Sequence, residues 1–363
     1  MSRQTGPNGH SREPGGGIPW LAAALAYIGT VVGAGFASGQ EVLQFFGLLG
    51  PPGVAAIALA TAGFAFFGYV AMDLGRRKGA TSHLPVIRAA VGRVLTPLVD
   101  FVVTFFLFGA ASAMFAGAGS VLQQEFGLPW VWGACTMAAA TTLTVAFGLR
   151  GVVSSLSAVA PFLIGTVIVI SVKAMWTKGF QVTSPPPGWA PVLPGWFVSS
   201  IVYVSYNIIT AVPVLASVGA GMREPRSIRR SSIAGALGLG VCLIAVYFAL
   251  VSGFPESLNH EVPMARLAEL VHPSGKMIYC AVFLLEVYTT AVADLFGFCS
   301  RLRPVGTTVF KALVPGSAVA ALLLARTGFS TLVRTVYPLS GLTGLVFLAG
   351  LTVAAARNAR HTA

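Results

Sequence analysis

Long apolar runs, separated by short polar segments, recur along the whole of this chain and limit the folds open to it. A helix of about 20 apolar residues is long enough to cross the hydrocarbon core of a bilayer. Charged residues make up only 9% of the chain, whereas a soluble domain carries about 25%. The sequence therefore predicts an all-α integral membrane protein, embedded in a lipid bilayer, with ten transmembrane helices. The ten runs lie at 19–46, 53–73, 98–120, 129–148, 153–175, 195–218, 231–252, 275–297, 305–325 and 329–356.

The basic residues are distributed unevenly between the segments that join these runs. With the N-terminus placed inside the cell, sixteen of the 23 Lys and Arg fall on the inner side, six on the outer side, and Lys311 inside a run. Because basic residues favour cytoplasmic loops, we predict that both termini are cytoplasmic. The net charge of +12 does not indicate nucleic-acid binding, which needs basic residues clustered on one face of a soluble domain.

The runs fall into two sets of five, on either side of a polar loop. Because each set is odd in number, two similar halves would have opposite orientations in the membrane, as in many transporters. The predicted segments are a disordered cytoplasmic tail (1–17), a first five-helix repeat (18–175), an extracellular loop (176–194), a second five-helix repeat (195–356) and a cytoplasmic tail (357–363).

Several landmarks recur in the two halves at a nearly constant offset. Pro161 and Pro338 are 177 positions apart, and Gly33 and Asn207 are 174 apart. The two long connecting loops each contain an amphipathic stretch with apolar residues at helical spacing. Together these landmarks predict a 5+5 inverted repeat.

The first run is too long for one straight helix, and its middle is rich in glycine. Its 28 positions would extend about 42 Å at ~1.5 Å per residue, beyond a hydrocarbon core of about 30 Å. Four glycines lie between positions 29 and 39, and each lowers helix stability by up to about 1 kcal/mol. We predict a helix that stops near 29–32 and restarts near Ser38, where Ser38 and Glu41 have the spacing of a capping box. The alternative is a glycine face packed tightly against a neighbouring helix.

The sixth run also contains residues that disturb a helix. Asn207 lies at its centre and Pro213 follows one to two turns later. A proline removes one hydrogen bond of the helix, and irregular backbone at this depth persists only against protein or a water-filled cavity. We therefore predict that helices 1 and 6 are both unwound at mid-membrane.

The residues around the first break resemble a known signature. Gly29, Val32, Gly33, Gly35 and Phe36 occur at the spacing of the first-helix signature of the amino acid–polyamine–organocation transporter superfamily. Members of this superfamily share the fold of the bacterial leucine transporter. The longer string VGAGFASGQE resembles the YkvI-like family of bacterial membrane proteins. The resemblance implies a leucine-transporter-like fold in the plasma membrane of a bacterial cell.

The resemblance implies that a small-molecule substrate lies between helices 1 and 6. The free N–H groups of Ala34 to Ala37, together with the start of the second half-helix, would suit a carboxylate, as helix N-termini do. Tyr203, Tyr206 and Asn207 would line the opposite wall, although interhelical packing is the alternative for each tyrosine. The predicted substrate-binding residues are Gly33, Ala34, Gly35, Phe36, Ala37, Tyr203, Tyr206 and Asn207.

The eighth run contains a carboxylate and two adjacent hydroxyls. Glu286 lies near its centre, and the spacings to Thr289 and Thr290 place all three on one face of a helix. A carboxylate at this depth must be protonated, paired or bound to a cation. The resemblance implies that sodium is the coupling ion, held by Gly29, Val32, Thr289 and Thr290. The alternatives are threonines that bond back to their own helix and a proton carried by Glu286.

Glu41 begins the outer half of the first helix, and Arg334 lies near the outer end of the tenth. Related transporters close their outer vestibule with an ion pair between these two helices, there with the opposite signs. We predict that Glu41 and Arg334 form such a gate; the alternative for Glu41 is the capping box alone. Asp73 and Asp294 are interpreted as solvated cytoplasmic charges.

The sequence as a whole predicts a secondary active transporter that moves an amino acid or a related small amine by alternating access, with no cofactor beyond sodium. The sequence contains no Walker motif, so ATP drive within the chain is not supported. Two alternatives stay open: a transporter-like receptor or sensor that binds a ligand without moving it, and a proton-coupled carrier. An intramembrane enzyme is disfavoured, because the sequence offers no convincing nucleophile–base pair or metal cluster.

Overall fold

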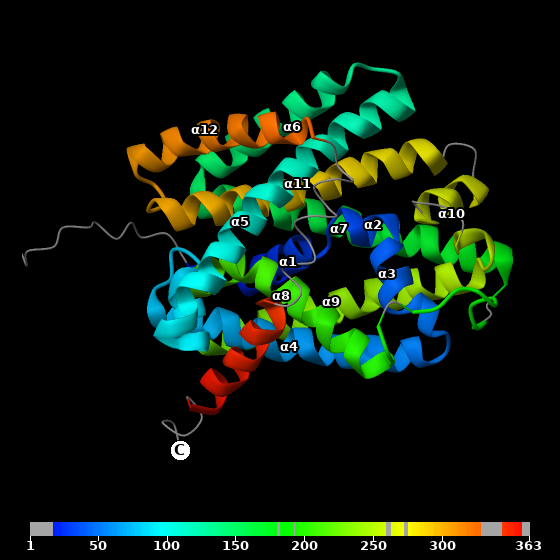
Figure 1. Cartoon of the computed structure of the whole chain (residues 1–363), viewed down its shortest axis with the longest axis horizontal. Coiled ribbons are helices and arrows are strands. Elements are labelled where there is room, and N and C mark those ends of the chain that lie inside the picture. The colour runs from blue at the N-terminus through cyan, green and yellow to red at the C-terminus, as the bar shows by residue number, and fades with distance from the viewer. Residues whose placement is uncertain are drawn as a thin grey trace, which may run out of the picture.

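The protein is described here by a computed structural model that covers residues 17–179, 182–191, 193–258, 263–271, 275–327 and 343–357. These residues are predominantly helical (Figure 1). Seven of the helices are long and apolar enough to cross a membrane. They are α4 (Pro52–Lys78), α5 (Leu84–Phe126), α7 (Gly148–Lys178), α8 (Trp196–Gly221), α9 (Pro225–Ser252), α11 (Gly275–Leu302) and α12 (Thr308–Ala325).

Three shorter apolar helices accompany them, and each of the ten predicted runs contains or overlaps one of these apolar helices. The all-helical membrane class is thereby confirmed, whereas ten as the number of spans stays a prediction. The shorter apolar helices are α1 (Trp20–Val31), α6 (Trp130–Ala146) and a helix at Thr343–Arg357. The remaining elements are α2 (Ala34–Ser38), α3 (Gln40–Phe45), α10 (Pro263–Val271) and the 3₁₀ turns η1 (Gly47–Leu49) and η2 (Glu256–Leu258).

Most of the helices form two groups, which lie toward opposite sides of the view in Figure 1. In the first group α1, α4, α8 and α9 pack on one another, and in the second α5, α6, α11 and α12 do so. α7 touches both groups, through α1 and α9 on one side and α11 on the other. The short α2 contacts α11, so the broken first helix reaches from one group to the other.

Glycine allows the closest approach within the first group. A Cβ atom on Gly75 of α4 would meet the backbone of Ala216, and one on Gly219 of α8 would meet the backbone of Met72. Only a hydrogen fits at either position. Contacts between small residues are typical of helices that associate in a membrane, where close packing replaces the hydrophobic effect as the driving force. α4 and α8 are therefore held as one unit.

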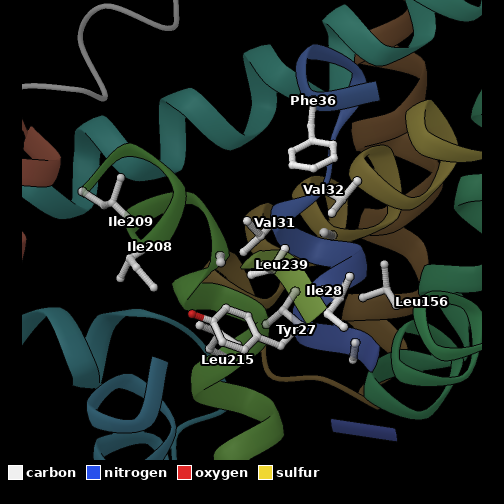
Figure 2. Packing of buried hydrophobic residues seen from close by; sticks show 14 of the residues in the cluster. Tyr27, Ile28, Val31, Val32, Phe36, Leu156, Ile208, Ile209, Leu215 and Leu239 are labelled. Carbon is white, nitrogen blue, oxygen red and sulfur yellow. The ribbon is translucent and has the colours of Figure 1, made fainter. Parts of the chain in front are cut away.

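The core around the first helix is apolar and closely packed. Figure 2 shows Val31 at the end of α1 and Val32 just after it, both below Phe36 of α2, with Leu156 of α7 and Leu239 of α9 nearby. All five side chains are at most 5% exposed. The break between α1 and α2 is thus enclosed by protein, which is the condition under which irregular backbone survives at membrane depth.

Both long connecting loops contain the amphipathic helix that the apolar spacing predicts. α5 departs from helical geometry at Gly92 (φ 74°), which separates its first turns from the apolar part that follows. Ile87, which lies in these first turns, is buried. Val94, which follows Gly92, is 90% exposed. In the second loop, α10 buries Met264 and Leu267. These matched helices support the inverted repeat, which stays a prediction.

Candidate functional site

The chain leaves helical geometry between α1 and α2, at Val32 (φ −70°, ψ 117°) and Gly33 (φ −132°, ψ −175°). The N–H of Val32 donates to the carbonyl of Ile28 at 2.8 Å, so the carbonyls from Gly29 onward lie at an open helix end without helical partners. The break begins where the sequence predicts it. The helix restarts earlier than predicted, however, at Ala34.

The predicted capping box at the start of the outer half-helix is wrong. Gly39 adopts a left-handed conformation (φ 82°) and is the residue that precedes α3. This turn starts the helix one residue later than a box between Ser38 and Glu41 requires. The Ser38 hydroxyl instead donates to the Gly35 carbonyl at 2.8 Å and accepts the N–H of Gln40 at 3.2 Å.

The carboxyl group of Glu41 turns back toward α2. Tyr206 of α8 donates its hydroxyl to Oε1 of Glu41 at 3.3 Å. A Cβ atom on Gly35 would lie 2.7 Å from Cδ of Glu41, so the missing side chain of Gly35 makes room for this carboxyl group. Arg334, the predicted partner of Glu41, lies outside the described residues, and the Glu41–Arg334 gate stays a prediction.

The start of α2 offers fewer free N–H groups than the sequence suggests. The N–H of Ala37 donates to the carbonyl of Gly33 at 2.9 Å, because it closes the first turn of a helix only five residues long. The expectation that Ala37 presents a free N–H group is therefore wrong. The N–H groups of Ala34, Gly35 and Phe36 precede the first helical donor.

α8 is continuous over Trp196–Gly221, so the prediction that the sixth helix unwinds at mid-membrane is wrong. Two polar side chains near its centre bond to the helix itself: Asn207 Nδ2 donates to the Tyr203 carbonyl at 2.9 Å, and Thr210 Oγ1 donates to the Asn207 carbonyl at 3.0 Å. Pro213 is accommodated inside the helix. Such intrahelical bonds supply the polar side chains with partners, so these residues need not open a helix at this depth.

Of the two predicted binding tyrosines, Tyr203 has a packing role in this conformation. Its ring centroid lies 5.1 Å from that of Phe45, 4.9 Å from that of Phe46 and 5.9 Å from that of Phe64. Its side chain is fully buried. Among the predicted wall residues, Tyr206 is therefore the one whose hydroxyl reaches a polar group of the broken first helix.

α11 carries three polar side chains spaced one turn apart, and the middle one, Thr290, faces the break. Its Oγ1 lies 3.1 Å from the place that a Cβ on Gly33 would take. Glu286, one turn earlier, is 0% exposed, and Asp294, one turn later, is 5% exposed. Within the described residues, both carboxylate oxygens of Glu286, Oγ1 of Thr290 and Oδ2 of Asp294 have no hydrogen-bond partner. Thr289 differs, because its hydroxyl donates to the Glu286 carbonyl at 3.0 Å.

Two aspartates interpreted as solvated are in fact buried. Asp73 is 5% exposed and is bound by Arg76 at 3.1 Å and Arg77 at 2.6 Å. Asp294 is also 5% exposed, because the part of α11 that carries it is packed among other helices. The position of each near a helix end concealed its burial.

A second polar cluster, which the sequence did not reveal, joins α5 to α11. Arg301 Nε and Nη2 contact the two carboxylate oxygens of Asp100 at 2.6 and 2.7 Å. His83 Nε2 lies 3.2 Å from the same carboxylate and 3.4 Å from the Thr104 hydroxyl. The His83 side chain is fully buried, and this burial lowers the pKa of its imidazole. No local pattern could have found the pair, since 201 positions separate Asp100 and Arg301.

Solved transporter structures share this arrangement of helices. MhsT in complex with L-phenylalanine superposes with a TM-score of 0.66 at 18% identity, covering 92% of this chain and 88% of MhsT. A Na⁺-coupled sialic acid symporter, in a substrate-bound outward-open state, gives a TM-score of 0.69 at 14% identity, covering 93% and 79%. The chain therefore has a leucine-transporter-like fold.

Sequence relatives are found along nearly the whole chain, although no protein-family model matches it. The uncharacterized membrane protein YkvI of Bacillus subtilis (strain 168) is 26% identical over 331 residues, covering 90% of this chain and 94% of the relative. The uncharacterized protein YyaD of the same organism is 30% identical over 335 residues, covering 92% and 95%. The chain belongs to the YkvI-like family of bacterial membrane proteins, together with YyaD and YkvI.

Proposed function

We propose that this protein is a secondary active transporter of an amino acid or a related small amine, driven by sodium through alternating access. The observation that carries the proposal is the break at Val32 and Gly33, which lies against the buried hydroxyl of Thr290 on α11. The fold, which is that of sodium-coupled symporters, supports it. In this proposal ten helices form two inverted sets of five in a bacterial plasma membrane, with both termini in the cytoplasm.

Sodium would be coordinated by the carbonyls of Gly29 and Val32 and by the hydroxyls of Thr289 and Thr290. Oxygen ligands suit a hard cation. The fit is supported by Thr290 Oγ1, which is buried without a partner among the described residues, and by the open end of α1. Thr289 uses its proton for the Glu286 carbonyl, which leaves the lone pairs of its oxygen available to a cation.

The solute would lie beside the break, between α2 and the face of α8 that carries Tyr206. Phe36 and Tyr203 are at most 1% exposed, so a solute would reach this place only after the helices move apart. Such movement is what alternating access requires of a carrier whose site is shared by two repeats.

Uptake into proteoliposomes tests the proposal. We expect an inward sodium gradient to drive accumulation of radiolabelled L-leucine or 3-methylbutylamine above its equilibrium level. Thr290→Ala should reduce the response to sodium, whereas Thr327→Ala, at an exposed position after α12, should leave it unchanged. Accumulation driven by a proton gradient alone would contradict sodium coupling. Saturable binding without flux under either gradient would contradict transport and identify a receptor.

A further inference from the structure

Two carboxylate side chains border the same short stretch of the broken first helix. Glu41 folds over Gly35, and Glu286 lies one helical turn from Thr290, which contacts the position of Gly33. Gly33 and Gly35 are two residues apart, so Glu41 lies at the beginning of α2 and Glu286 lies one turn along α11 from a residue that also borders it. They are near enough for their charges to interact.

No basic side chain balances these two acids among the residues that the structure describes, since none of the ion pairs found there includes Glu41 or Glu286. Glu286 is fully buried, and neither of its carboxylate oxygens has a partner in the described part of the chain. Buried polar groups in folded proteins are almost always satisfied by protein, water or an ion. An orphaned carboxylate of this kind therefore points to a ligand.

The groups that surround this place are mainly hydrogen-bond acceptors. They include the two carboxylates, the open carbonyls at the end of α1, and the oxygen of Thr290. The donors are the Tyr206 hydroxyl, which bonds to Glu41, and the N–H groups of Ala34, Gly35 and Phe36 at the start of α2. A ligand that fits must bring positive charge and several donors, and a primary ammonium group has three N–H donors and no acceptor.

We propose that Glu41 and Glu286 together bind the ammonium group of the solute, and that this solute is an amine without a carboxylate group. The inference rests on the proposed transport function and adds the chemical class of its substrate. Glu41 reaches the start of α2 from α3, and Glu286 shares the face of α11 that brings Thr290 against Gly33, so we place the ammonium group between the two carboxylates.

The carboxyl group of Glu41 also excludes a solute carboxylate from the start of α2. It occupies the space over Gly35, where the carboxylate of an amino acid would have to approach the free N–H groups. The ionised carboxyl group of Glu41 and a solute carboxylate side by side would repel each other strongly in a medium of low dielectric constant. A divalent metal is not favoured either, because the described residues contain no group of three or more metal-binding side chains.

Three probes of matched shape test the proposal on the purified full-length protein. 3-Methylbutylamine, L-leucine and 4-methylpentanoate share one branched chain and differ in their charged groups. Thermal-shift assays and isothermal titration calorimetry, each in sodium and in potassium salts, measure binding. We expect the amine to bind at least about tenfold more tightly than leucine, and the acid not to bind.

Charge-neutralising variants assign the binding to the two carboxylates. Glu286→Gln and Glu41→Gln should each weaken amine binding by about tenfold or more, the cost of removing one partner of a buried charged contact. Glu269→Gln, which alters an exposed glutamate paired with Arg266, is the matched control and should bind like the wild type. Without ligand, Glu286→Gln should melt no lower than the wild type, because it keeps the shape and removes a buried charge. Glu286→Asp keeps the charge but moves it away from the ligand, because the side chain is shorter by one methylene group. This variant should also weaken binding.

The outcomes separate this inference from the proposed function. Amine binding that both Gln variants retain, or tighter binding of leucine than of the amine, overturns the inference. So does stabilisation by sodium that requires both glutamates while the amine has no effect. Amine binding that depends on both glutamates, without uptake in proteoliposomes, overturns transport and leaves the inference standing. Uptake of leucine that is unchanged in both Gln variants supports transport and overturns the inference.

Discussion

At the scale of single residues, Gly35 determines where the Glu41 carboxyl group lies. An alanine methyl group there would be 2.7 Å from Cδ of Glu41, and the carboxyl group, at the end of a flexible side chain, would move away from Tyr206. We expect Gly35→Ala to fold but to lose amine-dependent stabilisation in the thermal-shift assay. Gly316→Ala on α12, where a Cβ would meet nothing within 4 Å, is the control. Unchanged amine binding in Gly35→Ala would show that the carboxyl position is unimportant.

The residues of the site were predictable to different degrees, for local reasons. Glu286 and Thr290 could be assigned to one face of a helix because their spacing fixes this geometry. The capping box failed because one left-handed residue, Gly39, shifts the helix start by a single position. The contact between Glu41 and Tyr206 links positions 165 apart, and spacing along the chain carries no information about such a distance.

At the scale of secondary-structure elements, the ion pair between Asp100 and Arg301 fastens α5 to α11. Two nitrogens of the guanidinium group, Nε and Nη2, contact the carboxylate. The side chains of Asp100 and Arg301 are 13% and 29% exposed. We expect Asp100→Asn to lower the free energy of unfolding by about 1.5–3 kcal/mol, the range for hydrogen bonds to charged groups. Thermal or denaturant unfolding in detergent measures this loss.

A double-mutant cycle with Arg301→Gln separates the pair from the two side chains taken singly. If the two losses are simply additive, the residues do not stabilise one another, and the proposed link between α5 and α11 is wrong. Arg303→Gln, at an exposed position just after α11, should have no effect and serves as the control.

The helices themselves could be predicted better than their interruptions. Long apolar runs require helices in a bilayer, because no other open structure satisfies the backbone there. The breaks depend on tertiary partners as well. In the first helix, glycines allow α11 to approach and the chain opens at Val32 and Gly33. In α8, Asn207 and Thr210 bond to their own helix, and the helix stays intact despite Pro213.

At the scale of the whole molecule, the distribution of basic residues predicts the orientation in the membrane. We expect a green fluorescent protein fused to the C-terminus to fluoresce, and alkaline phosphatase fused at the same place to be inactive, because both termini are predicted to be cytoplasmic. Fusions in the loop at 176–194 should give the opposite result. An active phosphatase at the C-terminus would place that end outside the cytoplasm and contradict the predicted topology.

The overall architecture was the most predictable level, because the order of apolar runs and the broken first helix together are typical of one transporter fold. The packing of that fold was not predictable to the same extent. Gly75 and Gly219 admit the backbone of the neighbouring helix, and such complementarity appears only when both surfaces are placed in space.

The two groups of helices meet where the acidic side chains lie. Glu41 is tied to the first group through Tyr206, and Glu286 belongs to the second through α11. When both glutamates are ionised and no cation lies between them, their negative charges repel each other and favour separation of the two groups of helices. An ammonium group bound between the two carboxylates would replace this repulsion with attraction to both. In the proposed carrier, binding of the ammonium group would then favour closure of the site, because it removes the repulsion between the two carboxylates.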